Sequence, residues 1–424
     1  MISSYQLKSK YVSALLAAII CFAAYASMTA FRKAYNVAPY SGYDLWGIDY
    51  KVILVITQVL GYMLSKFYGI KFISELKRFG RGKLILILVL ISWAAWLLFA
   101  VIPPPYNFWA LLFNGFPLGM LWGIVFSYIE GRRATDFIGA ALAVSFIFGP
   151  GLAKSVALFV MNDWGVSEYW MPFVTGLIFF LPLLLFIYLL EKIPPPTAED
   201  IAQRTERIAM TGGDRQAFVK TFLPGLALLV LVYIFVTLLR EVRDGFMADM
   251  WRASGETFNA GVFAKTEMLV SIGILVLIAS MVMVQNNMKA FLAAQWIMLG
   301  GFLLSGIITW LYLNHHVSMF QWMTIVGLGL YMTYIPYNSI LFERLLAAFK
   351  YAANVGFLIY LADSFGYLAS VGILLTKSIL KLELNWLQFY TSLVLYTSVG
   401  GSLFLLFSIF YFSRKRKVMV EKVS

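Results

Sequence analysis

The sequence predicts an all-α membrane protein whose twelve transmembrane helices form two pseudo-symmetric six-helix bundles. The chain has 424 residues and is 61% hydrophobic but only 13% charged, whereas soluble domains are about 45–50% apolar and about 25% charged. Apolar runs long enough to cross roughly 30 Å of hydrocarbon as helices recur from end to end. The runs are continuous rather than alternating, which excludes a membrane β-barrel. One long polar segment divides them into two equal sets.

The predicted spans all have lengths typical of membrane helices. They cover about 11–36, 50–70, 84–102, 107–129, 137–161, 169–191, 223–248, 260–284, 289–313, 318–343, 351–376 and 386–412. The long polar segment begins with three prolines and is otherwise mostly charged. We therefore expect an N-terminal bundle over 1–191, a cytoplasmic linker over 192–222, and a C-terminal bundle with a basic cytoplasmic tail over 223–424. Two six-span halves joined in this way are the layout of the major facilitator fold.

The distribution of lysine and arginine in the loops predicts the orientation of the chain. Nearly all of these residues fall on the side that carries both termini, and the other side has only Arg252, Lys377 and Lys381. Basic loops stay in the cytoplasm. We therefore expect a multi-pass protein of a bacterial inner membrane with both termini cytoplasmic. The same rule accounts for much of the net charge of +12, so the lipid bilayer, and no nucleic acid, is the expected partner.

Composition argues against metal sites, disulfides and most enzyme chemistry. Cys21 is the only cysteine, and the only histidines, His315 and His316, are adjacent in a short loop where we expect them to be solvated. We expect no cofactor and no metal. No phosphate-binding loop of the Gly-x-x-x-x-Gly-Lys type occurs, so ATP is not expected to drive the protein. An embedded enzyme would need a nucleophile–base pair, and isolated intramembrane carboxylates without histidine make one improbable.

Two arginines occupy corresponding positions in the first helix of each predicted half. Arg32 follows Tyr25 by seven residues, and Arg240 follows Tyr233 by the same interval, so each pair shares one helix face. Equivalent helices of the two halves would bring both guanidinium groups to the central axis. Paired guanidinium forks are suited to bidentate binding of a tetrahedral oxyanion. The alternative is that both arginines snorkel at the outer membrane interface.

Other ionisable residues also lie within the predicted spans, where each costs at least about 2.5–3.5 kcal/mol near the centre of the bilayer. Lys66 either lines a cavity or snorkels to the cytoplasmic surface. Glu267 and Asp363 are interpreted as ion partners or proton carriers, with a structural salt bridge to a nearby cation as the alternative. Lys154 and Lys265 complete this set.

Several short motifs are similar to those of the organophosphate:phosphate antiporter family of the major facilitator superfamily, which includes glycerol-3-phosphate and hexose-phosphate transporters. The similarity is scattered over nearly the whole chain. It includes Tyr25 through Arg32-Lys33, Ser65-Lys66-Phe67, Gly119-Met120-Leu121-Trp122, Phe235-Val236-Thr237-Leu238-Leu239-Arg240, Glu267 and Phe365-Gly366-Tyr367-Leu368.

The resemblance implies a phosphate site held by Arg32 and Arg240, with Lys66, Tyr25 and Tyr367 lining it. We assign Glu267, Lys33 and Asp363 to ion pairs that gate this site. The chain departs from the family in three places, which indicates a divergent branch. Phe146 stands where the family has a binding-site histidine. Lys77 and Ile73 replace the aspartate and glycine of the loop motif, and the charges Glu241, Arg243 and Asp244 follow Arg240.

These features predict a secondary active transporter of a small anion that works by alternating access as a monomer. A phosphorylated metabolite, exchanged for inorganic phosphate, is the leading substrate class. Two arginines also suit carboxylates, so a transporter of a carboxylate or another non-phosphate anion is an alternative. A membrane sensor of a sugar phosphate, with the same site but no transport, is a third reading.

Overall fold

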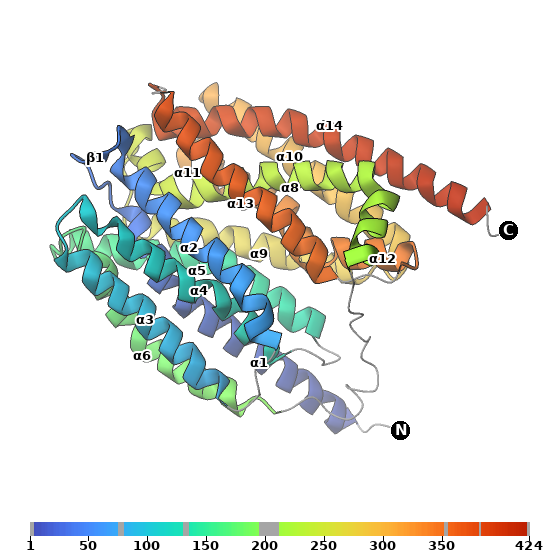
Figure 1. The fold of residues 1–424 in the computed structure, drawn as a ribbon, viewed down its shortest axis with the longest axis horizontal. Coiled ribbons are helices and arrows are strands. Elements are labelled where there is room, and N and C mark those ends of the chain that lie inside the picture. The colour runs from blue at the N-terminus through green and yellow to red at the C-terminus, as the bar shows by residue number, and fades with distance from the viewer. Residues whose placement is uncertain are drawn as a thin grey trace. The chain divides into compact units, whose positions relative to one another are not determined.

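The computed structural model is almost entirely helical and describes residues 4–74, 80–129, 135–194, 212–351, 355–380 and 383–421. The elements of its first part are α1 (Ser4–Lys33), η1 (Ala34–Val37), β1 (Asp44–Leu45), β2 (Ile48–Asp49), α2 (Tyr50–Ser74), α3 (Arg81–Val101), η2 (Tyr106–Phe108), α4 (Trp109–Ser127), α5 (Thr135–Asn162) and α6 (Met171–Lys192). The later elements are α8 (Gly212–Ser254), α9 (Val262–Val282), α10 (Asn287–Leu313), α11 (Met319–Ser339), α12 (Leu341–Ala348), α13 (Val355–Ile379) and α14 (Trp386–Glu421) (Figure 1).

The helices confirm a multi-span membrane protein. Ten of those in the described ranges are long and apolar enough to cross a bilayer, or eleven if α11 and α12, which meet at a bend of 50°, count as one broken span. The predicted span at 50–70 falls within α2, whose segment Tyr50–Ser65 is apolar. Twelve spans in the major facilitator arrangement stay a prediction.

Contacts between helices group the chain into two compact units. The first unit contains Met1–Arg204, Asp244–Ser271 and Leu374–Glu383, and the second contains Thr205–Arg243, Ile272–Ile373 and Leu384–Ser424. Helix α8 passes from the second unit to the first at Asp244 and is kinked at Phe246, where φ is −124° and ψ is 15°. Gly245 precedes this kink, and glycine is a common cause of a sharp bend. The linker predicted over 192–222 lies largely outside the described residues and stays a prediction.

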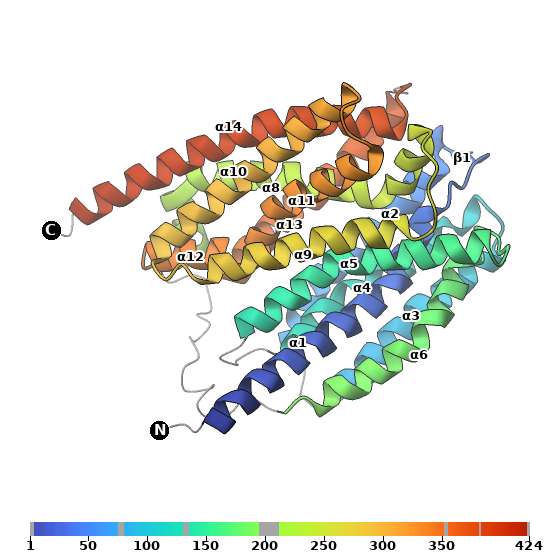
Figure 2. The ribbon, with the colours of Figure 1, turned by 180° about the vertical axis from the view of Figure 1, so that it is seen from behind.

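Close backbone contact between α2 and α4 organises the first unit. Gly115 and Gly119 of α4 are spaced four residues apart, as in membrane helices that pack through small residues. A Cβ atom at Gly115 would lie 2.4 Å from the carbonyl oxygen of Gln58, and one at Gly61 of α2 would lie 2.4 Å from that of Leu112. Helix α1 packs on α5, and α3 packs on α4 and α6 (Figures 1 and 2). These contacts place the end of α1 beside polar side chains of α2, α3 and α4.

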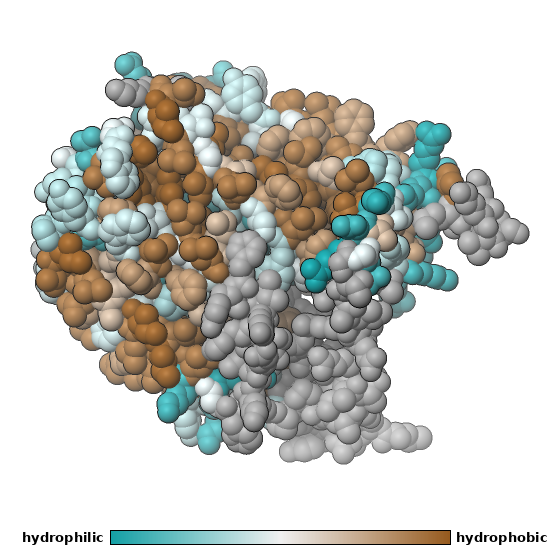
Figure 3. Space-filling model, viewed as in Figure 1, coloured by the Kyte–Doolittle hydropathy of each residue, from teal (hydrophilic) through white to brown (hydrophobic). Residues whose placement is uncertain are grey.

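Apolar side chains also cover the outside of the molecule, as expected where lipid replaces water. On α3 the exposed side chains Ile87, Leu90, Ile91 and Leu98 recur at helical spacing and form one continuous face. Hydrophobic surface is extensive in the space-filling view (Figure 3). The buried face of α3 packs into the apolar core of the first unit through Ile85, Val89 and neighbouring residues.

The second unit is built around α10, which packs on α11 and α14 (Figure 2). Helix α11 begins with a capping box in which the Ser318 hydroxyl accepts from the backbone N–H of Gln321 and the Gln321 side chain accepts from the backbone N–H of Ser318. It contains Pro336 near its end, and a proline inside a helix removes one backbone hydrogen bond and favours a bend. The bend before α12 follows at Ile340.

Candidate functional site

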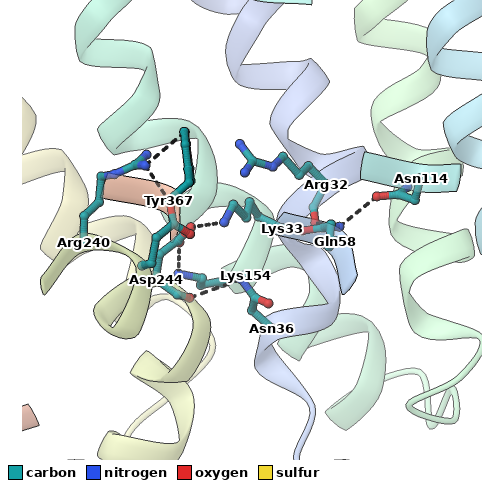
Figure 4. A network of polar contacts seen from close by, with 10 residues as sticks. Arg32, Lys33, Asn36, Gln58, Asn114, Lys154, Arg240, Asp244 and Tyr367 are labelled. Atoms are coloured by element: carbon teal, nitrogen blue, oxygen red, sulfur yellow. Dashed lines mark hydrogen bonds and ion pairs between the residues drawn. The ribbon is translucent and has the colours of Figure 1, made fainter. Parts of the chain in front are cut away.

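The end of α1 is fixed by side chains that bind its last carbonyl groups. Carbonyls in the final turn of a helix have no partner within the helix. The carbonyl oxygen of Phe31 accepts hydrogen bonds from Trp96 Nε1 at 2.6 Å and Asn114 Nδ2 at 2.9 Å. That of Arg32 accepts from Gln58 Nε2 at 2.8 Å (Figure 4). These buried amide and indole groups hold the backbone from which the Arg32 side chain extends.

Arg32 stacks on an aromatic ring of the first unit. Its Cζ atom lies 3.6 Å from the centre of the Tyr62 ring on α2. A guanidinium group stacked in this way keeps its N–H donors in the plane of the fork, where they can bind an oxyanion in a bidentate manner. Tyr25, two turns earlier on α1, is buried and packs edge-on against Phe146, with ring centres 5.0 Å apart. The aromatic partner of Arg32 is thus Tyr62, which the sequence analysis did not select.

One carboxylate of the first unit binds two buried lysines. Asp244 of α8 forms ion pairs with Lys33 of α1 through Oδ2 and with Lys154 of α5 through Oδ1, the latter at 2.5 Å (Figure 4). Lys33 is 6% exposed and Lys154 is 2% exposed. Asn36 of η1 donates to the backbone carbonyl of Asp244 at 3.2 Å. The carboxylate therefore ties α1, α5 and the last part of α8 together.

Glu267 of α9 is a buried carboxylate of the first unit, and it packs against the backbone of α5. It is 3% exposed. A Cβ atom at Gly151 would lie 2.5 Å from Glu267 Cγ, so the approach requires glycine at that position. Gly151 and Lys154 are three residues apart and so share one face of α5. The gating ion pair assigned to Glu267 stays a prediction.

A second ionic cluster holds the turn that follows α1. Lys51 Nζ, at the start of α2, lies 2.5 Å from Asp249 Oδ2 and donates to the carbonyl oxygen of Asn36 at 2.9 Å. Arg252 Nη1 lies 3.1 Å from Asp249 Oδ1, and its Nη2 donates to the carbonyl oxygen of Val37. Asp244 and Asp249, the two carboxylates near the end of α8, therefore hold η1 and the residues beside it. This limits where Arg32 and Lys33 can lie.

The loop after η1 adds a hydrogen bond between a backbone N–H group and a carboxylate to this region. The backbone N–H of Tyr40 donates to Glu168 Oε2 at 2.9 Å. Burial of the phenol, together with the neighbouring Glu168 carboxylate, raises the pKa of Tyr40 above its ordinary value. Tyr40 therefore stays protonated and contributes no charge to the first unit near neutral pH.

Arg240 of the second unit also lies among aromatic rings. Its Cζ atom is 4.6 Å from the ring centre of Tyr334 on α11 and 5.8 Å from that of Tyr367 on α13. Its Nη2 lies 3.3 Å from the Tyr367 hydroxyl (Figure 4) and 2.5 Å from Oε1 of Glu241, which is 2% exposed. A guanidinium, a carboxylate and two phenols therefore meet at this point of α8.

Asp363, the predicted carboxylate of the second unit, lies in the same polar cluster. The hydroxyl of Tyr233 donates to Asp363 Oδ1, and Asp363 is 4% exposed. Tyr233 stacks on Tyr334, with ring centres 5.9 Å apart. Asp363 and Tyr367 are four residues apart on α13 and therefore share a face. We call the set of Tyr233, Arg240, Glu241, Tyr334, Asp363 and Tyr367 the Arg240 cluster.

The structure brings some predicted site residues together within each unit and does not describe the side chain of one of them. Within the second unit, Arg240, Tyr367 and Asp363 belong to one cluster. In the first unit, Lys33 pairs with Asp244 and Tyr25 contacts Phe146. The side chain of Lys66 lies outside the described part of the molecule. That Arg32 and Arg240 share one anion stays a prediction.

The sequence analysis missed Tyr62, Tyr334 and the role of Asp244. Asp244 could have been found by charge balance, because two lysines within apolar spans require a carboxylate partner. Tyr334 belongs to a tyrosine-rich segment of α11 that was not considered. Across the ranges that the structure describes, no three histidine, cysteine, aspartate or glutamate side chains are grouped closely enough to hold a metal ion.

Comparison with known families identifies a matching family model. The profile of a family described as "Family of unknown function (DUF5690)" matches residues 34–415, which is most of the chain, and the protein therefore belongs to that family. A search of curated proteins found no match. The family description states no substrate.

Proposed function

We propose that this member of the DUF5690 family is a secondary active transporter that carries a small anion across the membrane by alternating access. A phosphorylated metabolite, exchanged for inorganic phosphate, is the proposed substrate class. In this proposal the protein works as a monomer, in a bacterial inner membrane, without a catalytic step. Arg32 and Arg240 hold the anion, with Lys66, Tyr25 and Tyr367 lining the site.

The observation that carries the proposal is the basic cluster of the first unit. Cations within apolar spans are costly, so they persist where they bind something. The buried lysines Lys33 and Lys154 share the half-buried carboxylate of Asp244, and Arg32 precedes Lys33 at the end of α1. This concentration of cations at the end of α1 favours an anionic ligand.

The two arginines support an oxyanion as ligand. Arg32 lies over Tyr62, and Arg240 lies over Tyr334. Stacking orders the guanidinium forks before the ligand arrives, so less side-chain entropy is lost on binding. A phosphate monoester carries about −1.5 to −2 charges at pH 7 and offers three acceptor oxygens, which is enough to engage both forks.

One contact favours the carboxylate alternative. Arg240 binds the carboxylate of Glu241 at 2.5 Å, so its fork accepts a carboxylate in the second unit. A dicarboxylate could engage the same donors. Competition between phosphorylated and carboxylated metabolites distinguishes these substrate classes.

The proposal is tested by exchange in proteoliposomes. Vesicles containing the purified protein are loaded with unlabelled inorganic phosphate, and entry of radiolabelled phosphate is compared with that into unloaded vesicles. We expect entry that depends on internal phosphate, that is lost in Arg32→Lys and Arg240→Lys, and that persists in Arg344→Lys. The control residue Arg344 donates to Asn287 Oδ1 at 2.6 Å and belongs to neither arginine site.

The remaining outcomes separate the alternatives. Phosphate binding without exchange would contradict transport and favour the sensor reading. Exchange of carboxylates without exchange of phosphate would mean that carboxylates, and not phosphorylated metabolites, are the substrate class. Neither binding nor exchange of either class would contradict the proposed function.

A further inference from the structure

One exposed face of α14 changes from apolar to basic along a single line of residues. Exposed aromatic and aliphatic side chains recur every three or four residues, which is helical spacing, at Tyr396, Val399, Leu403, Phe407 and Phe410. The next two positions of the same line, Arg414 and Lys417, are also exposed but carry positive charge. A face of this kind is typical of a membrane helix that leaves the hydrocarbon at its basic end.

Helix α8 repeats this pattern beside α14. Leu231, Ala227 and Leu223 are exposed at helical spacing, and Lys220 follows them on the same line toward the start of the helix. A Cβ atom at Gly225 would lie 2.5 Å from the rings of both Tyr411 and Phe412, so α8 and α14 are in close contact at this level. Two neighbouring helices therefore turn from apolar to basic at the same end of the second unit.

Lys415 joins the basic ends of these two helices. Its ammonium group donates to the carbonyl oxygen of Thr221 on α8 and, at 3.2 Å, to the hydroxyl of Tyr411. It also lies 5.0 Å from the ring centre of Phe222. An ammonium group has three N–H donors, and within the described ranges these contacts use two of them. Lys415 is thus held in place with a donor left for a ligand.

The charges at this end of the second unit are predominantly positive. Phe412 packs on Phe291 of α10 and on Phe349 after α12, with ring centres 5.0 Å and 5.9 Å apart, so these segments meet the end of α14. Hydrophilic residues gather around α12 and the end of α14 in the space-filling view (Figure 3). Among the described residues, the segments that meet here carry two carboxylates, Asp214 and Glu343, and the cations Arg215, Lys220, Lys289, Arg344, Lys350, Arg414, Lys415, Arg416 and Lys417.

We propose that this end of the second unit binds an acidic phospholipid. Lys220, Arg414, Lys415 and Lys417 hold its headgroup, and the exposed apolar faces of α8 and α14 contact its acyl chains. Such a lipid places negative charge at the boundary between hydrocarbon and water, where both helix faces become basic. A free phosphate ion would use only the cations, and the choline group of a neutral phospholipid would oppose them. The inference goes beyond the proposed function and does not depend on it.

The first experiment measures binding of a fluorescent phosphatidylglycerol to the purified full chain in a neutral detergent. Unlabelled phosphatidylglycerol should displace the probe at lower concentration than phosphatidylcholine or inorganic phosphate, and added salt should weaken binding. Equal displacement by phosphatidylcholine would show that acyl chains alone are recognised. Equal displacement by inorganic phosphate would show an ion site rather than a lipid site. Either outcome would overturn the inference.

The second experiment removes two cations from the exposed face of α14. Arg414→Gln/Lys417→Gln should weaken phosphatidylglycerol binding by roughly 30-fold, because each basic residue near an acidic lipid surface contributes a factor of about five. The matched control is Lys83→Gln/Lys192→Gln, which removes the same charge from exposed positions on α3 and α6 of the first unit. The control should bind as wild type. Wild-type affinity in Arg414→Gln/Lys417→Gln, or an equal loss in the control, would overturn the inference.

Lys220→Gln tests the contribution of α8 without altering α14. It should weaken phosphatidylglycerol binding by roughly fivefold. If Arg414→Gln/Lys417→Gln does not yield folded protein by size-exclusion chromatography, Lys220→Gln decides, and wild-type affinity in this variant would overturn the inference. Phosphate exchange enters none of these measurements, so failure of the proposed function and failure of the lipid site are distinguished.

Discussion

Lys154 of α5 and Asp244 of α8 form an ion pair with Nζ 2.5 Å from Oδ1, and the same carboxylate also binds Lys33 of α1. One aspartate thus compensates two buried lysines within the first unit. Removal of one partner of a buried ion pair costs more than the pair contributes, because a charge is left without compensation.

Asp244→Asn should destabilise the protein by about 3–5 kcal/mol, because Lys33 and Lys154 lose their counter-charge. The measurement is thermal or denaturant unfolding of the detergent-solubilised protein. Asp163→Asn is the matched control, since Asp163 is exposed at the end of α5. An unchanged unfolding midpoint in Asp244→Asn would show that the ion triplet does not support the fold.

Asn114→Leu should disturb the position of Arg32, although Asn114 itself is not proposed to contact the anion. Asn114 donates to the carbonyl oxygens of Phe31 and Ser92 and accepts from Gln58, and each buried polar group left unpaired costs about 1–3 kcal/mol. We expect a lower unfolding midpoint together with weaker phosphate binding. Asn314→Leu, in an exposed turn, should leave both unchanged. Wild-type phosphate affinity in folded Asn114→Leu would contradict a positioning role.

The sequence predicted the class of fold because hydrophobic length is a property of local sequence. Continuous apolar runs identified the membrane helices, and the spacing of tyrosine and arginine selected the helices that carry Arg32 and Arg240. Partners contributed by other helices could not be read in this way. Tyr62 and Tyr334, which the guanidinium groups contact, lie on other helices than the arginines, so no periodicity connects them.

The charges after Arg240 show the same limit. In the sequence analysis these charges were departures from the family that the chain resembles, and they were assigned no role. The structure gives each a contact. Glu241 pairs with Arg240, Arg243 donates to the carbonyl oxygen of Met323, and Asp244 pairs with two lysines. Charge balance in an apolar span could have predicted that partners exist, but only the packing of helices decides which they are.

Glu267→Gln should impair phosphate exchange more than equilibrium phosphate binding. Glu267 packs on the face of α5 that carries Lys154. Loss of its charge therefore alters the balance of charges beside α5, and in the proposed mechanism this balance changes as the site opens and closes. Exchange in proteoliposomes and binding by calorimetry are compared in the same preparation. Glu256→Gln, at an exposed position, is the control. Wild-type exchange in Glu267→Gln would remove this residue from the mechanism.

Both termini should be cytoplasmic. The prediction follows from the concentration of lysine and arginine in the loops on one side and from an even number of spans. Fusion of a reporter that is active only in the cytoplasm to the C-terminus should give signal, and fusion at the loop between α9 and α10 should also do so. Signal from a C-terminal reporter that is active only outside the cytoplasm would contradict the predicted orientation.

The central claim is that Arg32 and Arg240 bind the transported anion through the geometry of their forks, and calorimetry of phosphate binding to lysine variants tests it most directly. Lysine keeps the charge but replaces the fork with a single ammonium group. Each charge-assisted hydrogen bond contributes about 1.5–3 kcal/mol, so Arg32→Lys and Arg240→Lys should each weaken binding by roughly 10- to 150-fold, while Arg344→Lys binds as wild type. Wild-type affinity in folded Arg32→Lys and Arg240→Lys would contradict the account.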